Sequence, residues 1–217
     1  MLTGRRIISY SHAATDYVSL AEAKQHLRVT STSDDVYISN LISMAVDICG
    51  QQLGYSVRKA SVQYGFDSLV GQPAIMNPVN GTEQPTGNLL RIPARVISLT
   101  SVQYVDDNNT AQAFTDYITP PQPLGSYGRT IFITDAPSST TDDPTKYLVT
   151  VTEGFELATA TGVDAGLLFP QAVKFAALLI VGQLYDNRQA TTASNLNSSM
   201  EYGVDYLLQP YKAEQFI

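Results

Sequence analysis

The stretch Ser19-Leu-Ala-Glu-Ala-Lys-Gln-His-Leu-Arg-Val29 decides how the fold begins. Ser19 and Glu22 form a capping box, because the Ser19 hydroxyl can accept the Glu22 amide while the Glu22 carboxylate reaches back to Ser19. This pattern predicts a short helix directly after Ser19. Beyond a polar loop, Ser33 and the two aspartates that follow it predict the start of a longer helix, and Gly54 predicts its end.

The longer helix has one apolar face, since its apolar residues recur at intervals of three and four. They are Ile38, Leu41, Ile42, Ala45, Ile48, Cys49 and Leu53. Near the other end of the chain, Pro170 suits a first helical turn, and residues 171–185 are apolar around most of the helix. Such a helix is buried on nearly all sides, either in its own domain or against neighbouring copies. A last helix is expected over about residues 201–209.

Residues 56–168 have a different character, with alternating apolar residues and most of the Pro, Gly and Thr. Residues 96–105 and 111–114, separated by Asp106-Asp-Asn-Asn109, predict a hairpin. The chain is therefore expected to be an α+β protein, in which a small helical bundle domain carries an inserted antiparallel β-domain. The expected limits are 19–55 and 169–210 for the helical domain and 56–168 for the insertion. Residues 1–18 form an N-terminal arm and 211–217 a C-terminal tail.

The composition limits the function. Charged residues make up 15% of the 217 residues and the net charge is −7. Residues 130–217 alone hold four basic and ten acidic residues, and no basic stripe occurs anywhere in the chain. A tight duplex-binding face is therefore not expected, because neutralising phosphates needs clustered Lys and Arg. Two interpretations of the acidic surface stay open, a wall that repels passing DNA and simple solubility.

Residues that carry chemistry are sparse. Two histidines and one cysteine do not make a zinc site of the usual kind, and nucleotide-binding and nucleophile motifs are missing. The Asp106 run lacks the glycine and the final acid of a calcium loop, so it is interpreted as a turn. Cys49 is expected to be a buried structural thiol. We expect no cofactor, no metal, no enzymatic activity, no signal peptide and no membrane span.

Four segments together carry a family resemblance. They are residues 19–42, the run Ile92-Pro-Ala-Arg-Val-Ile-Ser-Leu-Thr-Ser-Val-Gln-Tyr-Val-Asp106, the helix from Phe169 to Arg188, and Gly203-Val-Asp-Tyr-Leu-Leu-Gln-Pro-Tyr211. In this order and spacing they resemble the head–tail connector (adaptor, or head completion) family of tailed phages, in the form that carries a β insertion. Asp186 stands where that family usually has Glu, and residues 1–17 have no evident counterpart.

The resemblance implies a structural virion protein. Such adaptors form a ring, commonly twelvefold, beneath the portal protein. The ring extends the DNA channel and links the head to the stopper or tail protein. The expected location is the neck of the virion, after synthesis and assembly in the host cytoplasm. Genomic DNA would pass through without sequence-specific binding, and the helical domain is expected to form the inner ring with the β-domain outside.

Three sets of site residues follow as hypotheses. Docking on the portal is assigned to Tyr206, Leu207, Leu208, Tyr211, Phe216 and Ile217, because aromatic and apolar side chains gather at this end of the chain. Contacts between subunits are assigned to His26, Arg28, Tyr185 and Arg188. Acidic residues lining the channel are Asp186, Glu201 and Asp205. For each set a purely structural role is the alternative.

Two other classes of protein stay open. One is another neck or tail component, such as a stopper or a tail terminator, which would be mainly β. The other is a carbohydrate-binding or adhesive β-domain, which would need an aromatic platform.

Overall fold

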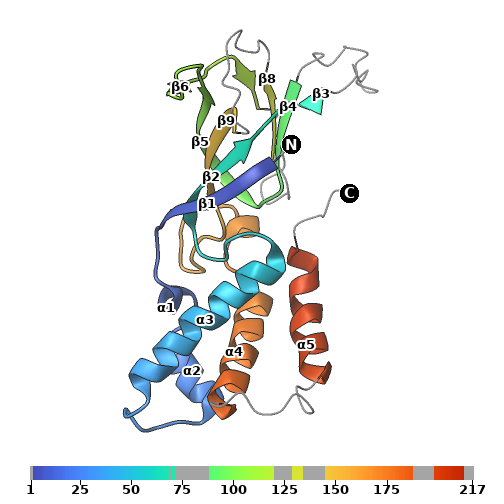
Figure 1. Ribbon diagram of the computed structural model, residues 1–217. Helices are drawn as coiled ribbons and strands as arrows, with labels where there is room; N and C mark the ends of the chain where they lie inside the picture. Colours follow the sequence, from blue (N-terminus) through green and yellow to red (C-terminus); the bar gives the residue numbers. More distant parts are fainter. Residues whose placement is uncertain are drawn as a thin grey trace. The chain divides into compact units, whose positions relative to one another are not determined.

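The computed structural model describes residues 2–68, 70–71, 88–119, 129–133, 145–187 and 198–212. Contacts divide the chain into two compact units, which Figure 1 shows. The β unit consists of the described residues within 1–9 and 61–153, and the helical unit of those within 10–60 and 154–215. The expected α+β fold, with helices from both parts of the chain and antiparallel strands between them, is confirmed.

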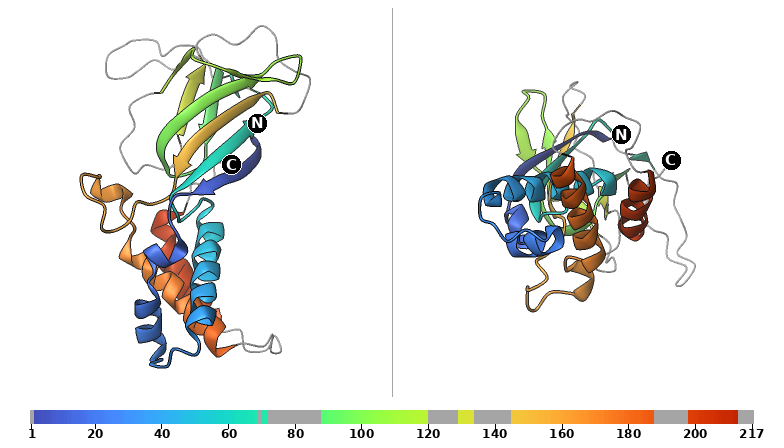
Figure 2. Two further views of the ribbon diagram at one scale, coloured as in Figure 1. Left: turned by 90° about the vertical axis from the view of Figure 1, so that its left-hand side faces the viewer. Right: turned by 90° about the horizontal axis from the view of Figure 1, so that it is seen from below.

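The helical unit is built from helices that lie far apart in sequence. They are α1 (Ala14–Tyr17), α2 (Leu20–Leu27), α3 (Asp35–Leu53), α4 (Gln171–Asp186) and α5 (Ser198–Leu208), with the 3-10 helices η1 (Ala165–Leu167) and η2 (Gln209–Tyr211). α4 lies between α3 and α5, and α2 contacts both α3 and α4 (Figure 1, Figure 2). Because isolated helices of this length are marginal in water, packing across the insertion stabilises them.

Local signals place the first two helices after α1. The Glu22 amide donates to the Ser19 hydroxyl at 3.2 Å, and the Ser19 amide donates to the Glu22 carboxylate at 2.9 Å. The predicted capping box of α2 is therefore confirmed. α3 differs in detail, because Asp34 and not Ser33 is its N-cap residue, and it caps without a side-chain hydrogen bond. Gly54 ends α3 in the left-handed conformation, as predicted.

The core of the helical unit is apolar and aromatic. The ring of Phe169 packs edge to face against the rings of Tyr17 and Phe155. Its centroid lies 5.1 Å from that of Tyr17 and 6.0 Å from that of Phe155. Cys49 is fully buried, as expected, and burial raises the pKa of its thiol to about 12. The thiol is therefore protonated at neutral pH, which makes it a poor nucleophile.

The β unit contains two sheets. One has the order β1-β2-β9-β5-β6 and the other β3-β4-β8-β7. The strands are β1 (Leu2–Tyr10), β2 (Ala60–Phe66), β3 (Val70–Gly71), β4 (Asn88–Ile92), β5 (Val96–Val105), β6 (Ala111–Ala113), β7 (Tyr117–Ile118), β8 (Arg129–Ile133) and β9 (Tyr147–Glu153). Buried residues alternate along β2, β4 and β8, so each sheet turns one face to the core of this unit.

The predicted hairpin is confirmed. β5 and β6 pair antiparallel, with Val105 opposite Ala111. The Asp106 carboxylate accepts the backbone amides of Asn108 and Thr110, each at 2.9 Å. The carboxylate is thus used to close the turn, as the interpretation against a calcium loop requires.

The boundaries of two expected segments differ from those that the structure shows. Residues 2–10 form strand β1 of the five-stranded sheet, and α1 follows, so residues 1–18 are not a separate arm. Residues 154–168 belong to the helical unit, so the β unit is shorter at this end than the expected 56–168. An edge strand that is exposed on both faces has no clean alternation of apolar residues, and the sequence therefore does not reveal it.

One glycine is required where the chain returns from β9. Gly154 has φ +108°, and a Cβ atom there would lie 2.4 Å from the carbonyl oxygen of Arg58. The next amide, of Phe155, donates to the carbonyl oxygen of Val57 at 3.1 Å. Two backbone segments therefore approach too closely for any side chain at this position.

We predict that Gly154→Ala lowers the free energy of unfolding by about 3 kcal/mol, because the variant combines a strained φ with a backbone clash. Gly162→Ala is the matched control. Gly162 also has a positive φ, +73°, but open space surrounds its Cβ position, so a loss of only about 1 kcal/mol is expected. Urea unfolding followed by circular dichroism measures both values, and equal losses would contradict the close approach.

Candidate functional site

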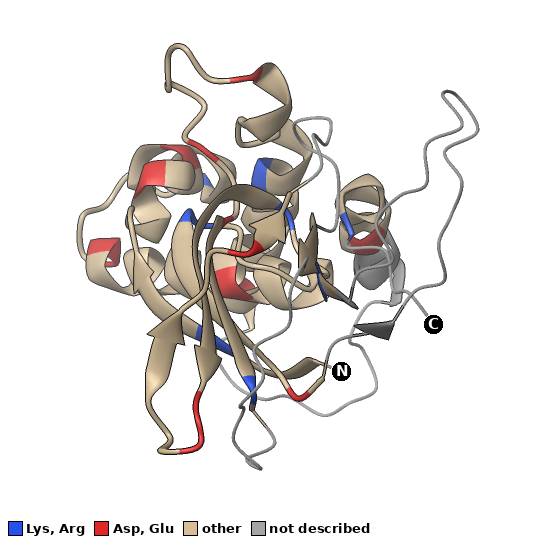
Figure 3. Cartoon of the chain, turned by 90° about the horizontal axis from the view of Figure 1, so that it is seen from above, with Lys and Arg blue, Asp and Glu red and all other residues tan. Residues whose placement is uncertain are grey.

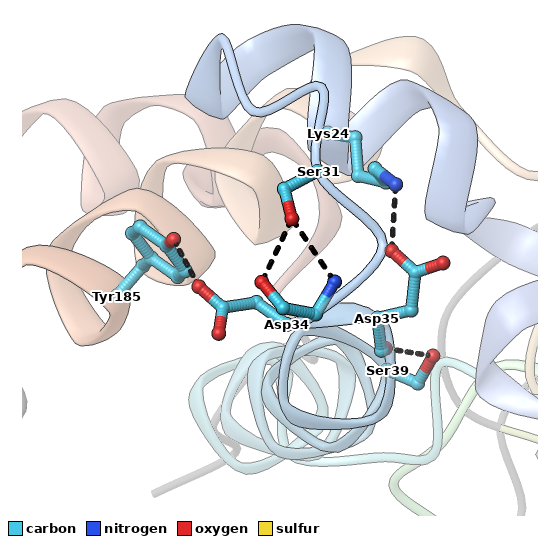
Figure 4. A network of polar contacts seen from close by, with 7 residues as sticks. Lys24, Ser31, Asp34, Asp35, Ser39 and Tyr185 are labelled. Atoms are coloured by element: carbon cyan, nitrogen blue, oxygen red, sulfur yellow. Dashed lines mark hydrogen bonds and ion pairs between the residues drawn. The ribbon is translucent and has the colours of Figure 1, made fainter.

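Polar side chains connect α2, α3 and α4 at one end of the helical unit (Figure 4). The Lys24 ammonium lies 2.6 Å from the Asp35 carboxylate, and the Tyr185 hydroxyl donates to the Asp34 carboxylate at 2.6 Å. The Ser39 hydroxyl donates to the backbone carbonyl of Asp35 at 2.8 Å. These contacts fix the loop between α2 and α3 against the end of α4, so this corner of the unit is held in one geometry.

A second ion pair ties α2 to α4. The Lys174 ammonium lies 2.9 Å from the same Glu22 carboxylate that closes the capping box. Partial burial alone would raise the pKa of Glu22, but the hydrogen bonds from Lys174 and Ser19 outweigh it, and the pKa of Glu22 is lowered. Glu22 therefore serves both the start of α2 and the packing of two helices.

The residues predicted to join subunits lie in different surroundings. His26 is exposed on α2, and its ring lies beside α4 where Gly182 leaves room, 3.5 Å from the position that a Cβ would take. Arg28 is exposed at the left-handed end of α2. Tyr185 already has partners in its own chain, through Asp34 and the ring of Tyr37, whose centroid is 6.1 Å away. Arg188 lies outside the described residues.

The predicted portal-docking residues separate into different environments. Tyr206 is 77% exposed on α5, whereas Leu208 is fully buried. Leu207 and Tyr211 are half-buried, and the Tyr211 carbonyl accepts a hydrogen bond from the Tyr55 hydroxyl at 2.7 Å. The assignment of Leu208 to docking is wrong for this structure, because its side chain fills the core of the helical unit. Phe216 and Ile217 lie outside the described residues.

The side chains of two of the three predicted channel-lining acids are described by the structure. Asp186 is exposed at the end of α4, and Asp205 is exposed on α5, where it pairs with Lys212. The side chain of Glu201 lies outside the described part of the chain. The carboxylates of Asp186 and Asp205 therefore both face solvent on the helical unit.

Exposed apolar side chains were missed by the sequence analysis. Val36 and Met44 on α3 are 77% and 50% exposed, and Phe175 on α4 is 55% exposed. Val36 and Met44 fall outside the apolar face of α3. The spacing of apolar residues that defines this face was the only signal in the sequence for the surroundings of these side chains. Phe175 lies in a helix expected to be buried on nearly all sides. A contiguous apolar patch marks a contact with another molecule, whereas single exposed apolar residues are common on protein surfaces.

The described residues give no support for other kinds of site. They contain no group of three or more His, Cys, Asp or Glu side chains that could hold a metal ion. Among these residues, no helix combines the length and the apolar character needed to cross a membrane.

Comparisons with known proteins agree with the sequence motifs. Residues 17–91 match the model of the phage gp6-like head–tail connector protein family. This match covers α2 and α3 and reaches β4, and it includes the motif that begins at Ser19. No curated protein sequence matches the chain. The resemblance of this chain to the head–tail connector family is therefore confirmed.

Solved structures share the fold over the whole chain. A structure described as the neck of an empty gene transfer agent (GTA) particle, computed with C6 symmetry, matches with a TM-score of 0.66 and 14% identity. The virion of a native GTA particle matches with a TM-score of 0.63 and 16% identity, and the neck of a native GTA particle, computed with C12 symmetry, with 0.58 and 15%. Each match covers 99% of this chain and 98% of the other. At this level of identity, the likeness shows a common fold that includes both units.

We predict that Glu22→Gln lowers the free energy of unfolding by about 1 kcal/mol near neutral pH, because the cap and the ion pair with Lys174 both weaken. The pKa of Glu22 is lowered from 4.5, so its contribution is present above that pH and is lost as the pH falls through the folded-state value. The difference between the variant and the natural protein should therefore shrink as the pH falls from neutral through the folded-state pKa of Glu22. Urea unfolding at neutral pH and at a series of acid pH values measures it.

The control is Asp47→Asn. Asp47 pairs with Arg58 at 2.8 Å but is half exposed and caps no helix, so its loss should be below about 0.5 kcal/mol. A difference for Glu22→Gln that stayed constant across the whole acid series would contradict the role of the ionised carboxylate.

Proposed function

We propose that this protein is a structural head–tail connector, an adaptor in the neck of a tailed phage or phage-like particle, and not an enzyme. The observation that carries the proposal is the combination of two matches. The family model covers α2 and α3, and the fold of proteins from GTA necks extends over 99% of the chain. The helices before β2 and after β9 favour a connector over a stopper or tail terminator, which would be mainly β.

The proposed assembly is a ring of twelve copies beneath the portal. Structures with the same fold come from necks computed with C6 and C12 symmetry, which supports a ring without fixing its number here. A ring needs a heterologous contact, in which one surface of a subunit meets a different surface of the next. In this arrangement the ring extends the DNA channel and offers its far side to the stopper or tail protein.

The helical unit is proposed to form the inner ring, with the β unit outside. Val36, Met44 and Phe175 then supply apolar surface for contacts with neighbouring copies. His26, Arg28, Tyr185 and Arg188 are proposed to contribute polar contacts between copies. Apolar and aromatic side chains are typical of the buried centre of such interfaces, and charged ones of the rim. The fixed corner at Asp34 and Asp35 would present this surface in one geometry.

Docking on the portal is proposed for the C-terminal region. Tyr206 is the exposed aromatic residue of α5, and residues 213–217 add Phe216 and Ile217. An aromatic side chain that enters a pocket of the partner can provide much of the affinity of an interface.

The expected result in solution is a large complex. The native mass of the purified protein, alone and mixed with the portal protein of the same particle, should correspond to a ring in at least one of the two samples. A protein that stays monomeric in both samples would overturn the connector function as stated.

Deletion of residues 213–217, combined with Tyr206→Ala, should abolish association with the portal and leave the fold intact. Deleting from residue 213 spares Tyr211, whose carbonyl is a partner of Tyr55. The matched control is Tyr104→Ala, a half-buried tyrosine of the β unit, which should leave portal binding unchanged. Equal binding by the deletion variant would overturn the docking assignment only.

The acidic residues Asp186, Glu201 and Asp205 are proposed to line the channel, where like charges repel passing DNA within a Debye length of about 8–10 Å. Asp186→Lys with Asp205→Lys should make the assembled ring retain double-stranded DNA at low salt, and added salt should release it. Gel mobility of the DNA measures this. Asp67→Lys in the β unit is the control, and equal retention by the control and the double variant would favour simple solubility.

A further inference from the structure

The five-stranded sheet of the β unit ends in two free edges among the described residues. β1 is one edge and β6 is the other, with β2, β9 and β5 between them. The outer side of an edge strand presents backbone N–H and C=O groups that can pair with a further strand. Within the described chain neither edge is covered by another strand.

β1 is an unusual edge because it is long and open. It extends over nine residues, and all of them except Ile7 are exposed. Leu2, Ile8 and Tyr10 add apolar surface, with 37%, 50% and 41% of each residue exposed. Natural proteins usually protect such edges by making them short, irregular or covered, so an open one indicates a place for another strand.

The edge is also held in place. Arg5 of β1 forms an ion pair with Glu153 of β9, whose side chain is fully buried, and the Tyr64 hydroxyl donates to the same carboxylate. The Arg5 guanidinium also donates to the Tyr64 hydroxyl at 3.2 Å. Removing Arg5 from this contact would leave a buried carboxylate without its cation, which is costly. β1 is therefore presented as a fixed template and not as a loose arm.

The two edges carry opposite charge. Residues 1–15 contain Arg5 and Arg6 and no acidic residue. Residues 96–114, which include β5 and β6, contain Asp106 and Asp107 and no Lys or Arg. Figure 3 shows acidic residues at the turn of the β5–β6 hairpin. Arg5 is used inside the sheet. Arg6 is exposed on this edge, where its guanidinium makes a long surface hydrogen bond to the side-chain oxygen of Gln63 at 3.4 Å, so it is the cation that a partner can exchange for this contact.

We propose that the β1 edge of one copy of this chain adds to the β6 edge of the next copy, so that the five-stranded sheet continues from subunit to subunit. The partner is a second copy because one chain carries both complementary edges. The contact is heterologous, and repetition about one axis closes a ring. The inference depends on the proposed function in one respect, because it requires that copies of the chain assemble. It adds a contact between β units to the apolar contacts proposed for the helical unit.

The chemistry of the contact is limited by the shorter edge. β6 has three residues, so it can pair with only part of β1. The turn that precedes β6 carries Asp106, whose carboxylate closes the turn, and Asp107. Ala111 and Ala113 have small exposed side chains, which leave room for the larger ones of β1. Charge across such a rim acts chiefly on association rate and register, and salt weakens it.

A charge-swap experiment tests the pairing. Arg6→Glu and Asp107→Arg, each alone, place like charges on the two edges and should raise the protein concentration needed for ring formation by roughly tenfold at low salt. The double variant restores opposite charges and should return the concentration to near that of the natural protein. Native mass as a function of protein concentration measures all four proteins, and circular dichroism checks that each is folded.

The two edges can also be linked directly. A chain with Ile8→Cys and Ala113→Cys, in a Cys49→Ala background, should form a ladder of disulfide-linked chains on oxidation. Each single cysteine variant should stop at a dimer or stay a monomer. No ladder, together with unchanged assembly of the charge variants, would overturn edge pairing while leaving the connector function in place. A natural protein that fails to assemble alone or with the portal would instead count against the proposed function itself.

Discussion

One buried tyrosine holds the helical unit together. The Tyr17 hydroxyl donates to the carbonyl oxygen of Phe155 at 2.9 Å and accepts the backbone amide of Lys59 at 2.8 Å. Lys59 leads into β2 and Phe155 follows β9, so one side chain fixes both ends of the inserted segment where they meet the helical unit. Leaving a buried amide and carbonyl unpaired would cost about 1–3 kcal/mol for each group. Burial also raises the pKa of Tyr17 to about 12, which keeps the donor protonated.

With Tyr17, Phe155 and Phe169 filling the centre, α3 and α4 pack through their small and branched residues. Phe175 lies on the side of α4 that faces away from the core, whereas the other apolar residues of this helix pack inside the unit. A helix that is apolar on all sides therefore makes contacts within its own chain and also presents an apolar side that is available to another molecule.

Much of the local structure could be predicted from the sequence, whereas the roles assigned to surface residues stay predictions. Tyr206 is exposed on α5 and Asp186 and Asp205 face solvent, as their proposed roles need. Leu208 was assigned to the same surface but is buried, because helical spacing shows which residues share a face and not which face meets the core. The open edge of β1 was missed, since a strand exposed on both faces has no apolar alternation to reveal it.

By itself the sequence determined the capping box at Ser19, the left-handed stop at Gly54 and the turn closed by Asp106. In each case the interacting groups lie within a few residues, so the local chain supplies both donor and acceptor. Only the tertiary structure decided that Arg5 pairs with Glu153, that Tyr185 pairs with Asp34, and that Gly154 must be glycine. These partners lie about a hundred residues or more apart, and only packing of the whole unit brings them together.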